Sequence, residues 1–203
     1  MHYDRVMEDC KVIVCTGGIG SGKSYVIKAF NAVGIPSYDS DGRAKKLYDC
    51  NEKLLSQVVG IAGDDILNNG RLDRKRLAEK IFSDQSLLER VEGVVHPAVL
   101  EDFELWKRRQ ESRIVIFESA IFLQKPQLRN IADYIVAITA PEEVRINRVM
   151  VRDSISREQV LERMSNQMPS EEIGKSADYT IYTNDRDAVL PQIYKILKIV
   201  ENR

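Results

Sequence analysis

The stretch "TGGIGSGKSYV", residues 16–26, decides which fold this chain can adopt. Within it, Gly17, Gly22, Lys23 and Ser24 satisfy the pattern G-x-x-x-x-G-K-[ST]. Glycines let the backbone wrap closely and turn its N–H groups inward as a nest for anions. A following helix adds its positive N-terminal end. In such loops the lysine reaches the β- and γ-phosphates of a nucleotide and the hydroxyl ligates Mg²⁺.

The residues on either side of the loop supply the context that the pattern requires. The apolar run "VIVC" (12–15) predicts a buried parallel strand, and the segment from Lys23 to Ala32 predicts a helix that Gly34 stops. The alternative is a glycine-rich turn with a solvated lysine, and the strand–loop–helix order favours phosphate binding. The residues expected to contact phosphate are Gly17, Gly18, Ile19, Gly20, Ser21, Gly22, Lys23, Ser24 and Tyr25.

The rest of the chain alternates apolar runs with segments of helical periodicity. Further strands are predicted at 35–39, 113–119, 133–139 and 178–182. The remaining predicted helices are 43–50, 52–59, 74–82, 84–92, 97–110, one opened by Pro141, 157–167 and 186–201, with a turn at "NNG" (68–70). This order predicts an α/β fold, a three-layer core with a parallel five-stranded sheet and helices inserted after its second strand.

Composition limits the possible partners and surroundings. Lys and Arg (30) nearly balance Asp and Glu (31), and the net charge of −1 predicts neither a nucleic-acid nor a membrane partner. Three cysteines without metal-ligand spacing suggest a reduced, cytoplasmic protein. Acidic residues precede any apolar run at the N-terminus, so no signal peptide is expected, and no stretch is long enough to span a membrane.

A phosphate-binding loop serves GTPases, motor ATPases and small-molecule kinases alike. A GTPase also needs a guanine-reading N-K-x-D, which is absent. "DSDG" (39–42) fits the GTPase pattern D-x-x-G but follows the loop's helix at once, leaving little room for a switch segment. A kinase needs an acid near the γ-phosphate, a lid with arginines and an acceptor pocket, and each has a candidate here.

Asp39 and Asp41 are the candidate acids, because they follow the C-terminal end of the second predicted strand. Ligands gather at that edge of an open α/β sheet. One carboxylate is expected to accept the proton of the acceptor hydroxyl and the other to hold water on Mg²⁺. The alternative is a helix cap, with Asp41 or Ser40 opening the 43–50 helix.

Arginines concentrate in the segment 145–167. Arg145, Arg148 and Arg152 recur at helical spacing, and guanidinium groups can meet the charge that spreads over a transferring phosphoryl group. Exposed arginines can also serve solubility alone; this alternative is favoured for Arg157 and left open for Arg145. The helical insertion is the candidate acceptor site, in which His96, before Pro97, is assigned a positioning role at the start of a helix.

With these elements in order, the chain resembles dephospho-coenzyme A kinases. The resemblance covers nearly all of the chain from Lys11, and "TGGIGSGKS" (16–24) is its least specific segment. Further segments that carry it are "GIPSYDSD" (34–41), "GRLDRKRLAEKIF" (70–82), "HPAV" (96–99), "NRVMVRD" (147–153) and "SADYTIYTN" (176–184). It implies ATP-dependent phosphorylation of the ribose 3′-hydroxyl of dephospho-coenzyme A, the last step of coenzyme A synthesis. It also implies a nucleotide-binding core (1–41, 113–140 and 176–203), a helical acceptor domain (42–112) and a lid region (141–175).

The resemblance also implies roles for individual residues. Asp41 is the base or the group that orients the hydroxyl, and Asp39 supports it or, with Ser24, the metal. Arg148 is the lid arginine that reaches the phosphates, with Arg152 second, and Asn184 lies near the adenine. The residues implied to bind or support the acceptor are Asp41, Lys45, Leu72, Arg74, Leu77, Phe82, His96 and Glu118.

The chain departs from the family's pattern at several positions. Tyr25 and Lys45 stand where Thr and Arg are usual, and Lys lacks the bidentate fork of Arg. Gln124 stands where a Glu commonly closes the third strand's apolar run, which leaves open whether Glu118 replaces it. Two other functions remain: another small-metabolite or nucleotide kinase with the same core, and a nucleotide-binding protein without catalysis.

Overall fold

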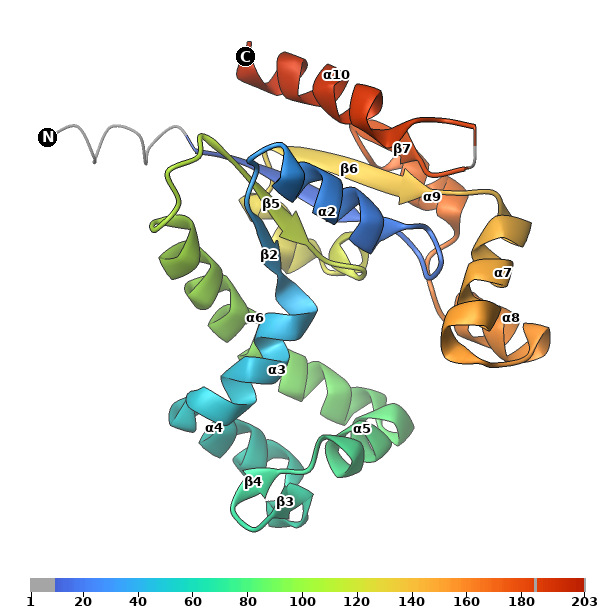
Figure 1. Ribbon diagram of the computed structural model, residues 1–203. Coiled ribbons are helices and arrows are strands. Elements are labelled where there is room, and N and C mark those ends of the chain that lie inside the picture. The colour runs from blue at the N-terminus through green and yellow to red at the C-terminus, as the bar shows by residue number, and fades with distance from the viewer. Residues whose placement is uncertain (1–9, 185, 203) are drawn as a thin grey trace, which may run out of the picture. The chain divides into compact units, whose positions relative to one another are not determined.

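The strand that precedes the glycine-rich loop lies in the middle of a five-stranded parallel sheet (Figure 1). This computed structural model describes residues 10–184 and 186–202. The strand order is β2-β5-β1-β6-β7. The strands are β1 (Lys11–Thr16), β2 (Ser37–Asp39), β5 (Ile114–Glu118), β6 (Tyr134–Thr139) and β7 (Tyr179–Tyr182). All five predicted strands are present.

The expectation that no signal peptide is present falls mainly on residues 1–9, which lie outside the described residues.

Two helices cover one face of this sheet and form the main core with it. They are α2 (Lys23–Ala32) and α10 (Val189–Glu201). Their buried side chains, such as Phe30 and Ile193, pack on strand residues such as Ile13 and Ile138. The intervening strand residues Val12 and Val14 are also buried, which explains the uninterrupted apolar runs in the sequence.

The chain divides into two compact units. One comprises residues up to Tyr38 together with the segment from Gln110 onward, and the other spans Asp39–Arg109. The segment predicted as a lid, 141–175, lies within the first unit. It contains α7 (Glu142–Asp153), α8 (Arg157–Ser165) and the short α9 (Ser170–Lys175), which was not predicted.

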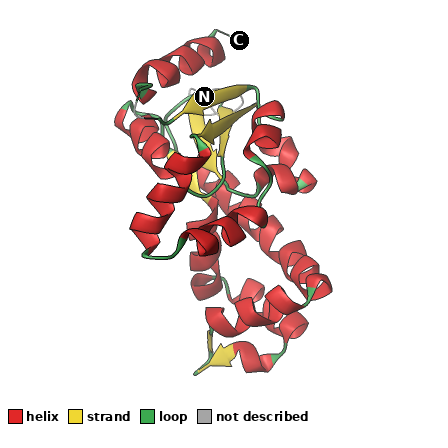
Figure 2. Cartoon of the chain, turned by 90° about the vertical axis from the view of Figure 1, so that its right-hand side faces the viewer, coloured by secondary structure: helices red, strands yellow, loops and turns green. Residues whose placement is uncertain are grey.

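The second unit is helical apart from one small hairpin (Figure 2). Its turn has Asn69 and Gly70 with positive φ, as a tight two-residue hairpin turn requires, and this explains the "NNG" signal. The elements of the unit are α3 (Ser40–Cys50), α4 (Glu52–Ala62), the 3₁₀ turn Asp64–Ile66, β3 (Leu67–Asn68), β4 (Arg71–Leu72), α5 (Arg74–Ser83) and α6 (Gln85–Lys107).

Helix α6 is continuous where two helices, 84–92 and 97–110, were predicted. Pro97 lies inside it, and His96 is therefore not at a helix start. Because Pro97 has no N–H, the Gly93 carbonyl lacks its usual helical donor. Both residues are exposed, so water can donate to that carbonyl instead. A buried stripe keeps the helix together across the proline: Leu87, Val91, Val95, Val99 and Phe103.

Asp39 is the N-cap of α3. Its Oδ1 accepts a hydrogen bond from the Gly42 backbone N–H at 2.9 Å, while Asp41 lies in the first turn and is exposed. The cap predicted for Asp41 or Ser40 is therefore made by Asp39. A Cβ on Gly42 would come within 2.2 Å of Asp39 Oδ2, so the glycine in "DSDG" makes room for the capping carboxylate.

No helix within 10–184 or 186–202 has the length and apolar character needed to cross a membrane.

Replacing Gly42 by alanine should destabilise the protein by disrupting this cap. A lost N-cap usually costs about 1–2 kcal/mol, and the alanine returns up to about 1 kcal/mol of helix propensity, so we expect Gly42→Ala to lower the free energy of unfolding by about 1 kcal/mol. Gly60→Ala is the matched control, since Gly60 lies in α4 with no atom near its would-be Cβ, and it should stabilise by up to about 1 kcal/mol. Urea unfolding of the full chain measures both. A Gly42→Ala protein as stable as the wild type would contradict the cap assignment.

Candidate active site

The loop between β1 and α2 presents unpaired backbone N–H groups at the start of a helix. Among the residues that the structure describes, the amides of Gly20, Gly22, Lys23 and Ser24 have no hydrogen-bond acceptor, whereas Ser21 N–H donates to Gly18 O at 3.1 Å. Gly20 and Gly22 have φ of 75° and 87°, a conformation that turns the chain and that side chains disfavour. Unpaired amides at a helix N-terminus form a binding site for phosphate.

The tip of the loop is fixed by the segment that follows β6. Ile19 N–H donates to Gln167 Oε1 at 2.8 Å, and Arg145 Nε donates to Ile19 O at 3.0 Å. The Ile19 side chain packs on a small apolar cluster formed by Ile146, Val149 and Val160 of α7 and α8. The backbone and side chain of Ile19 are thus both held.

Arg145 is a buried anchor of the loop. Its side chain is 6% exposed, and it also donates to the Ser170 hydroxyl. Burial lowers the pKa of its guanidinium, and the nearby Glu142 carboxylate opposes that shift. The sequence left open whether Arg145 serves solubility or binds phosphate. Its burial and its contacts instead give it a structural role.

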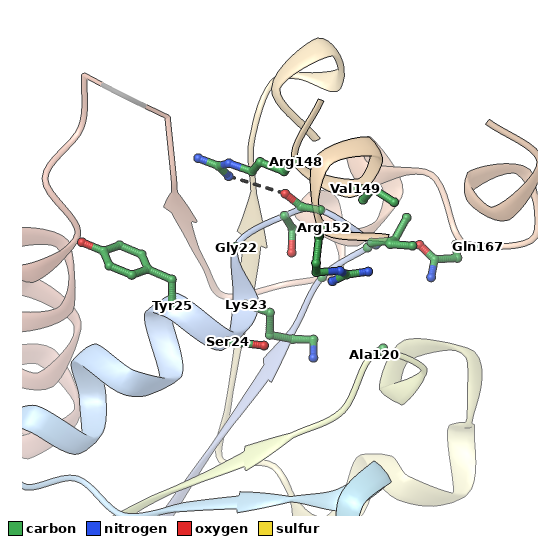
Figure 3. A pocket seen from close by; sticks show the side chains of 14 residues that line it. Gly22, Lys23, Ser24, Tyr25, Ala120, Arg148, Val149, Arg152 and Gln167 are labelled. Atoms are coloured by element: carbon green, nitrogen blue, oxygen red, sulfur yellow. Dashed lines mark hydrogen bonds between the residues drawn. The ribbon is translucent and has the colours of Figure 1, made fainter. Parts of the chain in front are cut away.

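Lys23 is paired with the carboxylate at the end of the neighbouring strand. Its Nζ lies 2.5 Å from Glu118 Oε1, and the two side chains are only 16% and 14% exposed. The register explains this placement, because Glu118 lies opposite Cys15 in the β1–β5 pair. Figure 3 shows Lys23 pointing into the space below the loop, with Ala120 across from it. Gln124, the other position considered for this carboxylate, is exposed in the short turn Phe122–Gln124.

Cys15 is an unreactive thiol beneath the loop. It is fully buried, and burial, followed by the Glu118 charge, raises its pKa far above the usual range, against the opposing effect of Lys23. A thiol held neutral in this way is neither a nucleophile nor a metal ligand.

Two arginines of α7 line the same hollow but differ in their partners (Figure 3). Arg148 donates to the Thr183 hydroxyl at 2.9 Å and to the Thr183 carbonyl, and weakly to Gly20 O at 3.5 Å. Among the described residues it has no carboxylate partner. Arg152, 62% exposed, is paired with Asp153, which also binds Arg163. Arg148 is therefore the better placed of the two to meet an anion.

Two hollows meet at the loop. One of about 400 Å³ is lined by 17–25 with Arg148, Arg152 and Gln167. The other, of about 430 Å³, is lined by Thr183, Asn184 and Asp187–Val189. Three residues line both hollows: Gly22, Tyr25 and Arg148. The first has cationic side chains and free amides, and the second has a mixed polar and apolar wall. Together they suit a phosphate chain joined to a base.

Asn184 shapes the wall of the second hollow through its own turn. Its side-chain oxygen accepts from the backbone N–H groups of Arg186 and Asp187, and its amide nitrogen donates to Asp187 Oδ2 at 2.8 Å. The side chain is thus occupied in holding the segment between β7 and α10.

Apart from Glu118 at the end of β5, the residues expected to bind the acceptor are spread over the 39–109 unit. Lys45 is exposed, and its carbonyl accepts from Arg74, which also pairs with Asp49 at 2.5 Å. Leu77 is 4% exposed and belongs to the core, whereas Phe82 is 89% exposed. Leu72 and His96 are partly buried, in β4 and in the middle of α6. Within this group the structure brings Lys45 and Arg74 together.

Several residues that organise the site escaped the sequence reasoning. Thr183 and Gln167 hold the loop from distant segments, and Arg43 forms a two-pronged ion pair with Asp102 at 2.7 and 2.5 Å between α3 and α6. Each is a common polar residue with no recognisable spacing, so only the fold reveals its partner. One feature of the sequence could have pointed to Thr183: it lies beside Asn184 in the segment 176–184, which carries the family resemblance.

A metal ion with a nucleotide needs few protein oxygens, because Mg²⁺ keeps several waters and binds the phosphates as well. The Ser24 hydroxyl makes no hydrogen bond to any described residue and stands at the start of α2, so it fits such an ion. Within the described ranges, no three His, Cys, Asp or Glu side chains gather as a metal site of their own.

Comparisons with known proteins show which family the chain belongs to. The family described as dephospho-CoA kinase matches residues 11–189. A dephospho-CoA kinase of Porphyromonas gingivalis is 39% identical over 189 residues, which is 93% of each chain.

Solved structures give the same result. A protein of Thermus thermophilus, TT1252, superposes with a TM-score of 0.82 at 33% identity, covering 93% of this chain and 96% of its own. Dephospho-CoA kinase from Campylobacter jejuni has a TM-score of 0.64 at 25% identity, covering 94% and 98%. The chain, with its phosphate-binding loop between β1 and α2, belongs to the dephospho-CoA kinase family.

Proposed function

We propose that this protein transfers the γ-phosphoryl group of ATP to the ribose 3′-hydroxyl of dephospho-coenzyme A, giving coenzyme A and ADP. Family membership supports the reaction. The observation that carries it is the pair of hollows meeting at the loop, where free amides, Lys23 and Arg148, held by neutral acceptors of Thr183, suit a triphosphate. In phosphoryl transfer, placement and charge supply most of the catalysis.

The triphosphate is assigned to the loop and the base to the second hollow. The unpaired amides of Gly20, Gly22, Lys23 and Ser24 donate to phosphate oxygens, and the other loop residues from Gly17 to Tyr25 shape the loop around them. Lys23 exchanges Glu118 for the β- and γ-phosphates, while Arg148, with Arg152 behind it, meets the charge of the transferring group. The turn held by Asn184 borders the base.

Asp41 and Asp39 are assigned separate roles. Asp41 is exposed in the first turn of α3, and there it accepts the proton of the 3′-hydroxyl or orients that hydroxyl. Asp39 uses one oxygen for its cap and retains the other for the metal. With Ser24 it would hold Mg²⁺, which supplies positive charge against the phosphates.

The 39–109 unit is assigned to the acceptor. Lys45 and Arg74 offer cations for the acceptor's phosphates, and the exposed ring of Phe82 offers an apolar surface. Leu72, His96 and Glu118 complete the assigned set, and Leu77 supports it from the core. Segment 141–175 acts as the lid.

The proposal also covers surroundings and partners. The three cysteines form no disulfide with one another, which suits the reducing cytoplasm. The partners are small molecules, with no nucleic acid or membrane among them.

The choice of acceptor distinguishes this function from that of another kinase with the same core. With Mg-ATP we expect turnover of dephospho-coenzyme A and none of nucleoside monophosphates or gluconate, followed as ADP release and by mass spectrometry of the product. Turnover of one of the others alone would assign a different kinase. Tight ATP binding without any transfer would indicate a non-catalytic nucleotide-binding protein.

Asp41→Asn should lower kcat by about 10²–10⁴-fold, the usual loss of a general base, while the Kd for ATP changes little. Asp39→Asn is the matched variant, since asparagine keeps the cap of α3 and loses only the charge. It should raise the Mg²⁺ concentration needed for half-maximal rate. Unchanged turnover in Asp41→Asn would reject its role.

The two lid arginines should differ in the size of their effects. Arg148→Ala removes a charge that no described carboxylate pairs with and should lower kcat by about 10²–10³-fold. Arg152→Ala removes an exposed arginine already paired with Asp153, and we expect a loss below about tenfold. Steady-state kinetics of both variants test this order, and a larger loss for Arg152→Ala would reverse the assignment.

A further inference from the structure

Thr183 lies at the point where the last strand meets the phosphate-binding loop. It directly follows β7, and its N–H donates to Thr139 O at 2.9 Å, continuing the pairing of β6 with β7. The residue is 3% exposed. Its backbone is thus fixed by the sheet, and its side chain has few alternative positions.

The Thr183 hydroxyl bridges the loop and the lid arginine. Its Oγ1 lies 2.6 Å from Ser21 O, 2.9 Å from Arg148 Nη1 and 3.5 Å from Thr139 O. A guanidinium only donates and a hydroxyl has a single proton. Thr183 Oγ1 therefore accepts from Arg148 and gives its proton to Ser21 O, the closer carbonyl.

The main chain of Thr183 holds the same guanidinium a second time. The Thr183 carbonyl accepts from Arg148 Nη2, so one residue supplies acceptors to both terminal nitrogens. These acceptors are neutral, so they orient the planar fork without cancelling its charge. Arg148 keeps its charge for a ligand at the junction of the two hollows.

Gly22 makes this contact possible. A Cβ there would come within 2.7 Å of Thr183 Oγ1 and 3.1 Å of its Cβ. The second glycine of the G-x-x-x-x-G-K-[ST] pattern therefore serves two purposes in this chain: it allows the loop's positive φ, and it admits the threonine that reaches Ser21.

We propose that Thr183 is a positioning residue for phosphoryl transfer, whose hydroxyl sets the loop carbonyl of Ser21 and the guanidinium of Arg148 in one fixed arrangement. This rests on the proposed function. A guanidinium placed before the reaction need not reorganise as charge develops on the phosphoryl group. Loss of the hydroxyl leaves Arg148 held at Thr183 by the carbonyl alone, with more freedom to reorient, and leaves Ser21 O without its donor.

Two substitutions that differ by one oxygen test this role. Thr183→Ser keeps the hydroxyl and should retain kcat within about threefold, whereas Thr183→Ala should lower kcat about 10- to 100-fold. The Kd for ADP, which has no γ-phosphate, should change by less than about threefold in both, because Arg145 and Gln167 still hold the loop. Wild-type kinetics in Thr183→Ala, or equal losses in the two variants, would overturn the proposal.

A double-mutant cycle separates positioning from general support of the fold. If Thr183 acts through Arg148, then Thr183→Ala should cost less than about threefold in kcat when Arg148 is already alanine. The same fold-loss in both backgrounds would show that Thr183 acts independently of Arg148. If thermal unfolding shows that Thr183→Ala does not fold, Thr183→Cys, with a similar volume and a weak hydrogen-bonding thiol, replaces it.

The wild-type assay keeps this test apart from that of the proposed function. No turnover of dephospho-coenzyme A by the wild type would reject the function but not the bridge. The affinity for Mg-AMP-PNP, an ATP analogue with an uncleavable γ-phosphate, then carries the test. Thr183→Ala should bind it about tenfold more weakly than Thr183→Ser, and equal affinities would overturn the proposal.

Discussion

The structure depends on one constraint: the amides of the phosphate-binding loop must stay unpaired and yet be held in place. A buried unpaired N–H is costly, so a chain leaves such groups free only where neighbouring contacts fix the backbone. Here β1, in the middle of the sheet, supplies one end and α2 the other. The tip is held through Ile19 by Arg145 and Gln167, and the far side through Ser21 by Thr183. The two flanking elements and three residues distant in sequence thus keep one anion site ready for its ligand.

Much of the first unit could be predicted because parallel strands buried on both faces appear as continuous apolar runs. The ends of α2 matched the prediction, since a glycine loop precedes Lys23 and Gly34, with φ of 86°, follows Ala32. The sheet edge that gathers Glu118 beside the loop follows from the same rule. The sequence also predicted that Asp39 and Asp41 lie at the end of β2, although it did not show that Asp39 would cap α3.

Other features depend on packing that a local pattern does not contain. Pro97 suggested a break, yet the apolar stripe from Leu87 to Phe103 carries α6 through it. Arg145 and Arg148 have the same charge and lie one turn apart, but one is buried against Ile19 and the other stands where two hollows meet. Thr183 is an ordinary polar residue, and its importance arises from the end of β7 reaching Ser21. Such roles come from tertiary neighbours, which no spacing in the sequence specifies.

The measurement that tests the account most directly is a crystal structure with dephospho-coenzyme A and Mg-AMP-PNP bound. The account predicts phosphate oxygens on the Gly20, Gly22, Lys23 and Ser24 amides and Lys23 moved from Glu118 to the phosphates. The Thr183 bridge from Ser21 to Arg148 should be retained. It also predicts Asp41 within hydrogen-bond reach, about 2.6–3.2 Å, of the ribose 3′-hydroxyl. Phosphates bound elsewhere, a loop that refolds around them, or an acceptor hydroxyl remote from Asp41 would contradict it.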